Sequence, residues 1–296
     1  MKYPLVFIPG MMCDSRLFQP QISEFSKQYL VCIAPLSYSD SIEKISFEIL
    51  RQLPPKFTLI GLSMGGILAM EIIKKVPERV MKIVLMDTNY KSETSEIQSR
   101  RLPQIQLVNE GLLEEVMCQQ IKNNYLRKDK QNQEIFDLCL SMANGLGKEI
   151  FINQSTALAN RKDYKSTLKN IKIPSLIICG EYDRLCPIKV HMEMESLIEN
   201  STLEIIPDAA HLPTLEQPAY LNKILCEWLI RKIIEMEVNL KKILVTHVGS
   251  LPRKQEVVDF IFARENNQKY NQDDFDNVMN KAVLETVKKQ VNSGVD

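Results

Sequence analysis

Three residues far apart in the chain have side chains that together could perform nucleophilic catalysis: Ser63, Asp183 and His211. A free serine hydroxyl is a poor nucleophile, so a neutral imidazole must take its proton. A carboxylate must then fix the tautomer of that imidazole and stabilise it once it is charged. This combination of residue types predicts acyl transfer through a serine nucleophile.

The surroundings of Ser63 favour this interpretation. The segment FTLIGLSMGG, residues 57–66, begins with a short apolar run typical of a buried strand, and the apolar residues after it recur at helical spacing. The pattern G-x-S-x-G from Gly61 to Gly65 therefore predicts a sharp strand-to-helix turn that presents the serine hydroxyl above a sheet. The N–H of Met64, at the helix N-terminus, can meet a developing oxyanion. A tight connection with a capping serine is the alternative.

A second oxyanion donor is expected where the first strand ends. The apolar run 5–8 leads into Pro9, Gly10 and Met11. This chemistry takes its second backbone N–H from such a loop near the nucleophile, which makes Met11 the candidate donor. An ordinary strand exit is the alternative reading of the same residues.

The base can be chosen from only three histidines. His211 lies in the loop PDAAHLPTLEQP, directly after a predicted strand. His191 falls inside a predicted helix, where a surface or core role is expected, and His247 lies beyond the last element of this region. His211 is therefore the predicted base.

The acid is expected in the loop GEYDRLCP, which carries Asp183 just past the predicted strand 175–179. Asp87, at the end of an earlier strand, and Asp208, near the predicted base, are alternatives, because other loop ends could also reach the imidazole. Asp183 is the predicted acid, and the resulting order of serine, aspartate and histidine along the chain is the one that this arrangement requires.

Strand-like and helical segments alternate along most of the chain, which predicts an α/β fold with a mostly parallel sheet covered by helices on both faces. The predicted strands are residues 5–8, 30–34, 58–60, 80–86, 175–179 and 203–206, and the predicted helices are 41–50, 64–76, one from about 188, and 217 to about 235.

Residues from about 91 to 170 differ, because apolar residues recur there at helical spacing and no convincing strand appears. Such an insertion in an α/β enzyme is usually a lid over the pocket. Arg100, Arg101 and Arg161 could meet an acidic substrate group there, although solvated helix faces are the commoner role of such arginines. The apolar residues of this lid favour small or medium uncharged substrates.

Composition excludes several classes of protein. The 296 residues contain 37 basic and 37 acidic side chains, which argues against a nucleic-acid binder or an electrostatic membrane anchor. No segment resembles a signal peptide or a membrane span. Seven cysteines without a repeated spacing indicate a reducing compartment, so a cytoplasmic protein is expected. No metal-ligand spacing, phosphate loop or dinucleotide fingerprint occurs, so no metal and no cofactor are expected.

Several motifs follow one another in the first part of the chain: PG after the first strand, GLSMGG, PERV, MDT, CGEYD and HLPTLEQP. Through them residues 1 to about 235 resemble the α/β-hydrolase superfamily, in particular its bacterial esterase and lactonase-like branch. The resemblance implies a serine hydrolase with Ser63, Asp183 and His211 as catalytic triad and Met11 and Met64 as oxyanion donors. The first loop reads IPG where many relatives have HG, which affects the position of the first donor.

The remaining residues, 237–296, differ in character. The segments KKILVTHVGSLPR and FDNVMNKAVLETVKKQVNSGVD resemble the opening of the barrel of cobalamin-independent methionine synthase-like proteins. A barrel of this kind needs eight strands, whereas one strand and two helices are expected here. We therefore expect domains at 1–236 and 237–296, the second being a barrel fragment or αβ appendage that could contact a partner or a second copy of the chain.

The expected function is that of an enzyme that cleaves a carboxylic ester or lactone through an acyl-enzyme intermediate, with a small molecule as its partner. Lactone opening, carbon–carbon bond hydrolysis and perhydrolysis can use the same triad, and the fold alone does not separate them. A non-catalytic binding protein or scaffold that retains this fold is the alternative from a different class.

Overall fold

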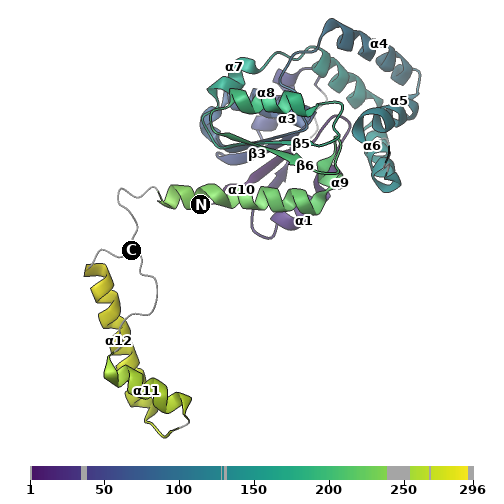
Figure 1. Ribbon diagram of the computed structural model, residues 1–296. Coiled ribbons are helices and arrows are strands. Elements are labelled where there is room, and N and C mark those ends of the chain that lie inside the picture. Colours follow the sequence, from purple (N-terminus) through teal and green to yellow (C-terminus); the bar gives the residue numbers. More distant parts are fainter. Residues whose placement is uncertain are drawn as a thin grey trace. The chain divides into compact units, whose positions relative to one another are not determined.

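The computed structural model describes residues 2–34, 39–127, 129, 132–238, 254–266 and 268–292 (Figure 1). The chain forms two compact units, Met1–Lys232 and Ile233–Asp296. The first unit contains a sheet and all the residues predicted to do chemistry, and the second contains helices. Each unit is described below by itself.

The first unit is built on a sheet of six strands in the order β2-β1-β3-β4-β5-β6, and every neighbouring pair is parallel. Strands β1, β3 and β5 are buried along their whole length, as expected of strands covered on both faces. The prediction of a mostly parallel sheet is confirmed. The strands are β1 Leu5–Ile8, β2 Val31–Ile33, β3 Phe57–Leu62, β4 Val80–Met86, β5 Ser175–Gly180 and β6 Ser201–Ile206.

The helices cover both faces of this sheet (Figure 1). Alternate residues of β1 enter different cores: Leu5 and Phe7 pack into one, Val6 and Ile8 into the other, as the two-residue period of a strand requires. The first core also contains residues of α1 and α10, and the second contains residues of α2, α3 and α8. These helices are α1 Gln19–Phe25, α2 Ile42–Leu50, α3 Met64–Lys75, α8 Ile188–Leu197 and α10 Pro218–Val238.

Short helical turns connect several of these elements. A separate short helix, α9 Pro213–Glu216, precedes α10, and α10 itself begins one residue after the predicted start at residue 217. The 3-10 turns are η1 Ser15–Phe18 and η2 Pro77–Arg79.

The insertion between β4 and β5 is helical, and no strand occurs among its described residues. Helix α6 is broken at Gly147, whose φ of 80° interrupts the helical backbone. Helices α4, α5 and α6 of the insertion pack on one another. Its last helix, α7, instead packs against α3 and α8, beside the sheet. The elements are α4 Ser95–Asn109, α5 Leu113–Gln120, the π-helical turn η3 Ile121–Tyr125, α6 Gln133–Ala159 and α7 Lys165–Asn170.

The second unit contains helices α11 Gln255–Glu265 and α12 Gln272–Asn292, which pack on each other. Phe260, Tyr270 and Phe275 form a cluster in which the ring centroids lie 5.5 to 6.3 Å apart. The strand expected within KKILVTHVGSLPR, residues 241–253, lies outside the described residues. The methionine synthase-like resemblance of this unit stays a prediction.

No helix among the described residues is both long enough and apolar enough to cross a bilayer. The seven cysteines are all free thiols.

Helix α3 approaches strand β1 closely at Gly65, in the first turn of the helix. A Cβ atom at this position would lie 1.9 Å from the carbonyl oxygen of Ile8, a backbone atom that cannot rotate away. The absence of a side chain therefore lets α3 begin against the end of β1, and this contact fixes the position of the turn that precedes it.

We predict that Gly65→Ala lowers the free energy of unfolding by about 3 kcal/mol or more, because overpacking against backbone cannot be relieved by a rotamer change. Gly145→Ala is the matched control, since a Cβ there would meet only the Arg16 guanidinium at 3.8 Å. Chemical denaturation measures both variants. Equal stabilities would contradict this account of the α3 contact.

Candidate active site

Ser63 occupies the sharp turn between β3 and α3. Its φ of 56° and ψ of −117° are unfavourable for a residue with a side chain, and this strain is held by the surrounding hydrogen bonds. The Ser63 N–H donates to the Met86 carbonyl at 2.9 Å, and the Thr88 hydroxyl donates to the Ser63 carbonyl at 2.7 Å. The residues after β4 thus support the turn that presents the serine.

His211 connects Ser63 with Asp183. Its Nδ1 lies 2.9 Å from Asp183 Oδ2, and its Nε2 lies 3.0 Å from Ser63 Oγ. An ionised carboxylate can only accept, so Nδ1 carries the proton in the neutral ring and Nε2 is the acceptor that faces the serine hydroxyl. The structure therefore brings together the three side chains that the sequence singled out.

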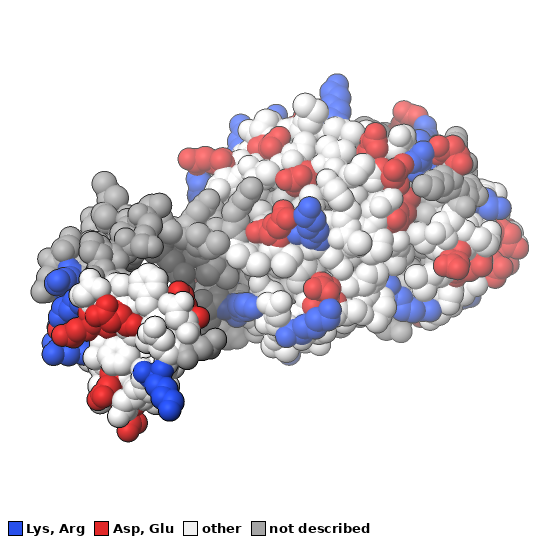
Figure 2. All heavy atoms as spheres, turned by 60° about the horizontal axis from the view of Figure 1, so that its bottom comes forward, with Lys and Arg blue, Asp and Glu red and all other residues white. Residues whose placement is uncertain are grey.

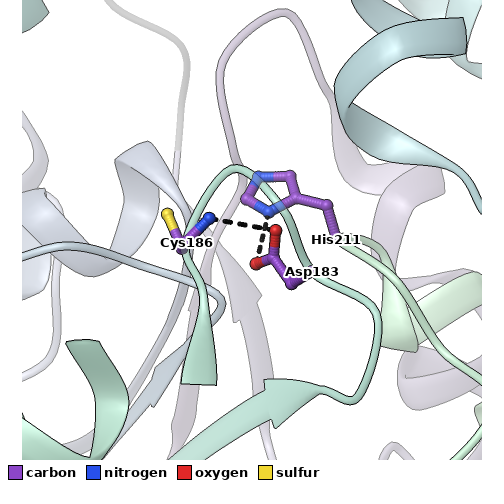
Figure 3. Close-up of side chains that lie close together, drawn as sticks. All are labelled: Asp183, Cys186 and His211. Atoms are coloured by element: carbon purple, nitrogen blue, oxygen red, sulfur yellow. Dashed lines mark hydrogen bonds and ion pairs between the residues drawn. The ribbon is translucent and has the colours of Figure 1, made fainter. Parts of the chain in front are cut away.

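Asp183 is held in place by the loop that contains it. Its Oδ1 accepts from the N–H groups of Leu185 and Cys186 at 2.8 and 3.0 Å, and Figure 3 shows the carboxylate between the Cys186 N–H and the His211 ring. Burial raises the pKa of Asp183, but the charge and hydrogen bond of His211 and the loop N–H groups outweigh it, so its pKa is lowered overall. Asp183 is therefore the charged member of the site.

Asp87, the alternative acid, is buried behind Asp183. Its Oδ1 accepts from the Gly180 N–H at 2.7 Å, while its Oδ2 has no donor partner among the described residues. Burial, and next the charge of Asp183, raises the pKa of Asp87. Protonation of Asp87 removes the repulsion between two buried carboxylates, and a neutral Asp87 can donate a hydrogen bond to Asp183. Asp87 thus contacts the predicted acid and not the histidine.

Two further residues position His211, and sequence reasoning missed both. Glu216 Oε2 accepts from the N–H groups of Ala210 and Leu212, which flank the histidine, at 2.9 and 3.0 Å. The backbone carbonyl of Tyr125 accepts from the backbone N–H of His211 at 3.1 Å, and the centroid of the Tyr125 ring lies 5.5 Å from that of the imidazole. The spacing of a carboxylate five residues after the histidine was the only sequence signal for either contact.

The other candidates have different roles. His191 is fully buried, its Nε2 accepts from the Thr88 N–H at 3.1 Å, and burial lowers its pKa to about 4. It is a neutral core histidine, as expected for its position in a helix. Asp208 forms an ion pair with Arg127 at 2.5 Å, so its carboxylate is directed at another partner.

The two predicted oxyanion donors line the same cavity as Ser63. Met64 is the first residue of α3, so its N–H has no acceptor within the helix. No described residue accepts from the Met11 N–H, whereas the next N–H, of Met12, donates to Gln154 Oε1 at 2.8 Å. Gln154, a buried residue of α6, therefore fixes the loop that contains Met11, and the sequence gave no signal for this contact.

This cavity has a volume of about 590 Å³. Helices α4, α5 and α6 and the turn η3 all contribute to its lining, together with the loops that follow β3, β4 and β5. Arg100, Arg101 and Arg161 are among the lining residues; Arg100 is exposed, but the side chains of Arg101 and Arg161 are only 17% and 9% exposed. A second hollow, lined by Tyr90 and Glu193 among others, contains none of the five predicted site residues.

Two groups of side chains around Asp183 have the residue types and proximity of metal ligands, one with Cys186 and His211 and one with Asp87 and Cys179. Both oxygens of Asp183 are already hydrogen-bonded. Burial raises the pKa values of Cys179 and Cys186, which opposes the thiolate form that metals require. These contacts favour a hydrogen-bonded acid–histidine pair over a cation site.

Comparison with known proteins shows the family to which the chain belongs. The family model described as "alpha/beta hydrolase fold" matches residues 35–218, more than half of the chain. The protein is an α/β hydrolase. The predicted fold class is confirmed, and the strand-to-helix turn at Ser63 lies within the matched region.

Individual relatives of the α/β hydrolase include a putative synthase and an esterase. It is 29% identical over 77% of its length to a putative 2-succinyl-6-hydroxy-2,4-cyclohexadiene-1-carboxylate synthase of Bacillus subtilis, covering 86% of that protein. It is 27% identical over 72% of its length to a pimeloyl-[acyl-carrier protein] methyl ester esterase of Legionella pneumophila, covering 89% of that protein. A solved esterase from Thermogutta terrifontis shares the fold, with a TM-score of 0.71, 22% identity and coverage of 79% of this chain and 91% of that one.

We predict that Asp87→Asn retains most of the activity of this hydrolase, whereas Asp87→Ala does not. Asparagine can accept from the Gly180 N–H and donate to Asp183, so it reproduces the protonated acid. Alanine leaves a buried N–H without a partner, which costs about 1–3 kcal/mol. The lost hydrogen bond also raises the pKa of Asp183, so the acidic limb of the pH profile of kcat/KM moves to higher pH. Similar profiles for both variants would contradict the protonated state of Asp87.

Glu216 gives the hydrolase a pH-dependent term in its stability. Burial raises its pKa from 4.5 to about 7, so the folded state binds this proton more tightly than the unfolded chain does. The resulting contribution is complete below pH 4.5 and is lost as the pH rises through about 7. Relative to Glu216→Gln, the parent should lose on the order of 3 kcal/mol of unfolding free energy across this interval.

Urea denaturation at a series of pH values measures this difference. Glu227→Gln, on the exposed side of α10, is the matched control and should show no such trend. A constant difference between parent and Glu216→Gln from pH 4.5 to 7 would be incompatible with a raised pKa at Glu216.

Proposed function

We propose that the protein is a serine hydrolase that cleaves a carboxylic ester or lactone through an acyl-enzyme intermediate. One observation carries the proposal: the His211 ring lies within hydrogen-bond distance of both the Ser63 hydroxyl, at 3.0 Å, and the Asp183 carboxylate, at 2.9 Å. A nucleophile, a base and an orienting acid in this relation are the requirements of serine catalysis.

In the first half of the reaction, Ser63 Oγ attacks the carbonyl carbon while its proton moves to His211 Nε2. Asp183 stabilises the imidazolium that forms, and the backbone N–H groups of Met11 and Met64 stabilise the negative charge on the carbonyl oxygen. His211 then gives its proton to the departing alcohol oxygen, which leaves the acyl group on Ser63. Ser63 and His211, which exchange the first proton, are already within hydrogen-bond distance of each other, as are His211 and Asp183.

In the second half, a water molecule takes the place of the alcohol. His211 removes a proton from it as it attacks the acyl carbon, and the same two N–H groups stabilise the second oxyanion. The proton returns to Ser63 Oγ as the acid product leaves. Helices α4 to α6, which line the cavity, serve as the lid that separates these steps from bulk water.

The relatives support a carboxylic ester as the substrate. The Legionella pneumophila relative is named as an esterase of a methyl ester, which is the bond type that this arrangement of serine, histidine and aspartate can cleave. The cavity of about 590 Å³ has room for a small or medium acyl group beside Ser63. The seven free cysteines support a reducing compartment, the cytoplasm, as the location.

We predict that a fluorophosphonate labels Ser63 covalently and that Ser63→Ala abolishes both labelling and ester turnover. Asp183→Asn should lower kcat by about 10⁴, since the histidine is then held in the wrong tautomer. Mass spectrometry of the labelled peptide and a series of p-nitrophenyl esters and lactones measure these effects. Ser99→Ala, at an exposed serine of α4, is the control and should behave as the parent.

An unlabelled Ser63 at high reagent concentration would count decisively against the acyl-enzyme mechanism. Ligand binding that persists in Ser63→Ala, together with a parent that turns over no ester or lactone, would instead assign the protein to non-catalytic binding. Turnover of lactones but not of open-chain esters would restrict the substrate class without changing the mechanism.

A further inference from the structure

The cavity beside Ser63 carries an uneven distribution of charge. Four arginines and one glutamate contribute to its lining, a formal excess of three positive charges. Arg100 and Arg101 come from α4, Arg161 follows α6, and Arg184 follows β5. The arginines thus reach the cavity from three separate segments of the chain.

This excess is local. The whole chain contains equal numbers of basic and acidic residues, 37 of each. On the face of the molecule shown in Figure 2, red and blue side chains are interspersed over the described surface. A concentration of arginines at the cavity therefore does not follow from the general composition of the protein and needs its own explanation.

Glu93 fixes the orientation of two of these arginines. Its side chain is 1% exposed. Arg101 donates to it through Nε at 2.8 Å and Nη2 at 2.5 Å, and Arg161 donates through Nη1 at 2.6 Å. Arg161 Nε also donates to the Lys91 carbonyl at 2.9 Å. Both guanidinium groups are therefore held in fixed positions before any ligand arrives, which lowers the entropic cost of binding one.

One carboxylate cannot balance two guanidinium groups. Within the described part of the chain, Arg101 Nη1 and Arg161 Nη2 have no acceptor, although both side chains are largely buried. Burial lowers the pKa of Arg161, and the charge of Glu93 only partly opposes this effect. A second anion between these groups would supply the missing negative charge and the missing acceptors.

We propose that Arg101 and Arg161 form a subsite for an anionic group of the substrate, so that the enzyme acts on esters carrying a second, uncleaved carboxylate or phosphate. This inference rests on the proposed function and names its substrate class. It replaces the sequence-based expectation of an uncharged substrate, because the lining of the cavity combines apolar side chains with these oriented guanidinium groups.

Two pairs of matched compounds test the subsite. The first pair is monomethyl adipate and its neutral amide, methyl adipamate, which have nearly the same shape and differ in charge. We expect kcat/KM to be about 10- to 100-fold higher for the carboxylate, the range of a charge-assisted hydrogen bond. A methyl ester with a terminal phosphate distinguishes the two anions, and a preference for it over the carboxylate assigns the subsite to phosphate-bearing esters.

Variants locate the effect. Arg101→Gln leaves Glu93 paired with Arg161 and should reduce the preference for the charged ester, mainly by raising KM for that ester. Arg101→Lys keeps the charge but not the planar fork, so it should restore part of the preference. Arg51→Gln, at an exposed arginine after α2, is the control and should retain the parent preference.

Binding to the full-length Ser63→Ala variant separates the subsite from the chemistry. Calorimetry should detect adipate binding that is at least tenfold tighter than adipamide binding, whether or not the parent turns over esters. Equal affinities for adipate and adipamide, or equal kcat/KM values for the two methyl esters in a parent that a fluorophosphonate labels, would overturn the anionic subsite and leave the serine mechanism intact.

Discussion

The hydrogen bonds of His211 are the constraint on which the site depends, because one small ring must reach a hydroxyl and a carboxylate at the same time. Ser63, Asp183 and His211 follow β3, β5 and β6, and the carboxyl ends of parallel strands meet at one edge of a sheet. The approach is close: a Cβ at Gly180 would lie 1.8 Å from the Ala210 carbonyl. Because Gly180 has no side chain, the loop after β5 can contact the loop after β6. This contact brings Asp183 close to His211.

The electrostatics around the imidazole are arranged so that a single negative charge faces it. Three carboxyl groups lie near His211, but only Asp183 has a lowered pKa, while those of Asp87 and Glu216 are raised. Three ionised carboxylates in a buried site would repel one another, so two of them hold protons more tightly and the third carries the charge. Buried His191 is also neutral, with a pKa near 4. The supporting side chains thus contribute hydrogen bonds without adding charge.

The helical insertion has two effects on this site. Through Gln154 it holds the loop that contains the Met11 N–H, and through Tyr125 it contacts both the backbone and the ring of His211. The same helices supply most of the polar lining of the cavity. The strand ends of the sheet therefore bring Ser63, Asp183 and His211 together, and the insertion holds the loop and the histidine beside them and lines the cavity.

The sequence by itself determined most of the strands, the turn at Ser63 and the order of serine, aspartate and histidine, because strand and helix periodicities and turn glycines are local properties of the chain. It could not choose finally between Asp87 and Asp183, since both follow strands that end at the same edge, and only the tertiary structure decided which carboxylate meets the imidazole. It also left two interpretations open for Arg101 and Arg161, contact with an acidic substrate group and a position on a solvated helix face. Burial and pairing depend on how distant segments pack, so the role of Glu93 between them became visible only in the folded molecule.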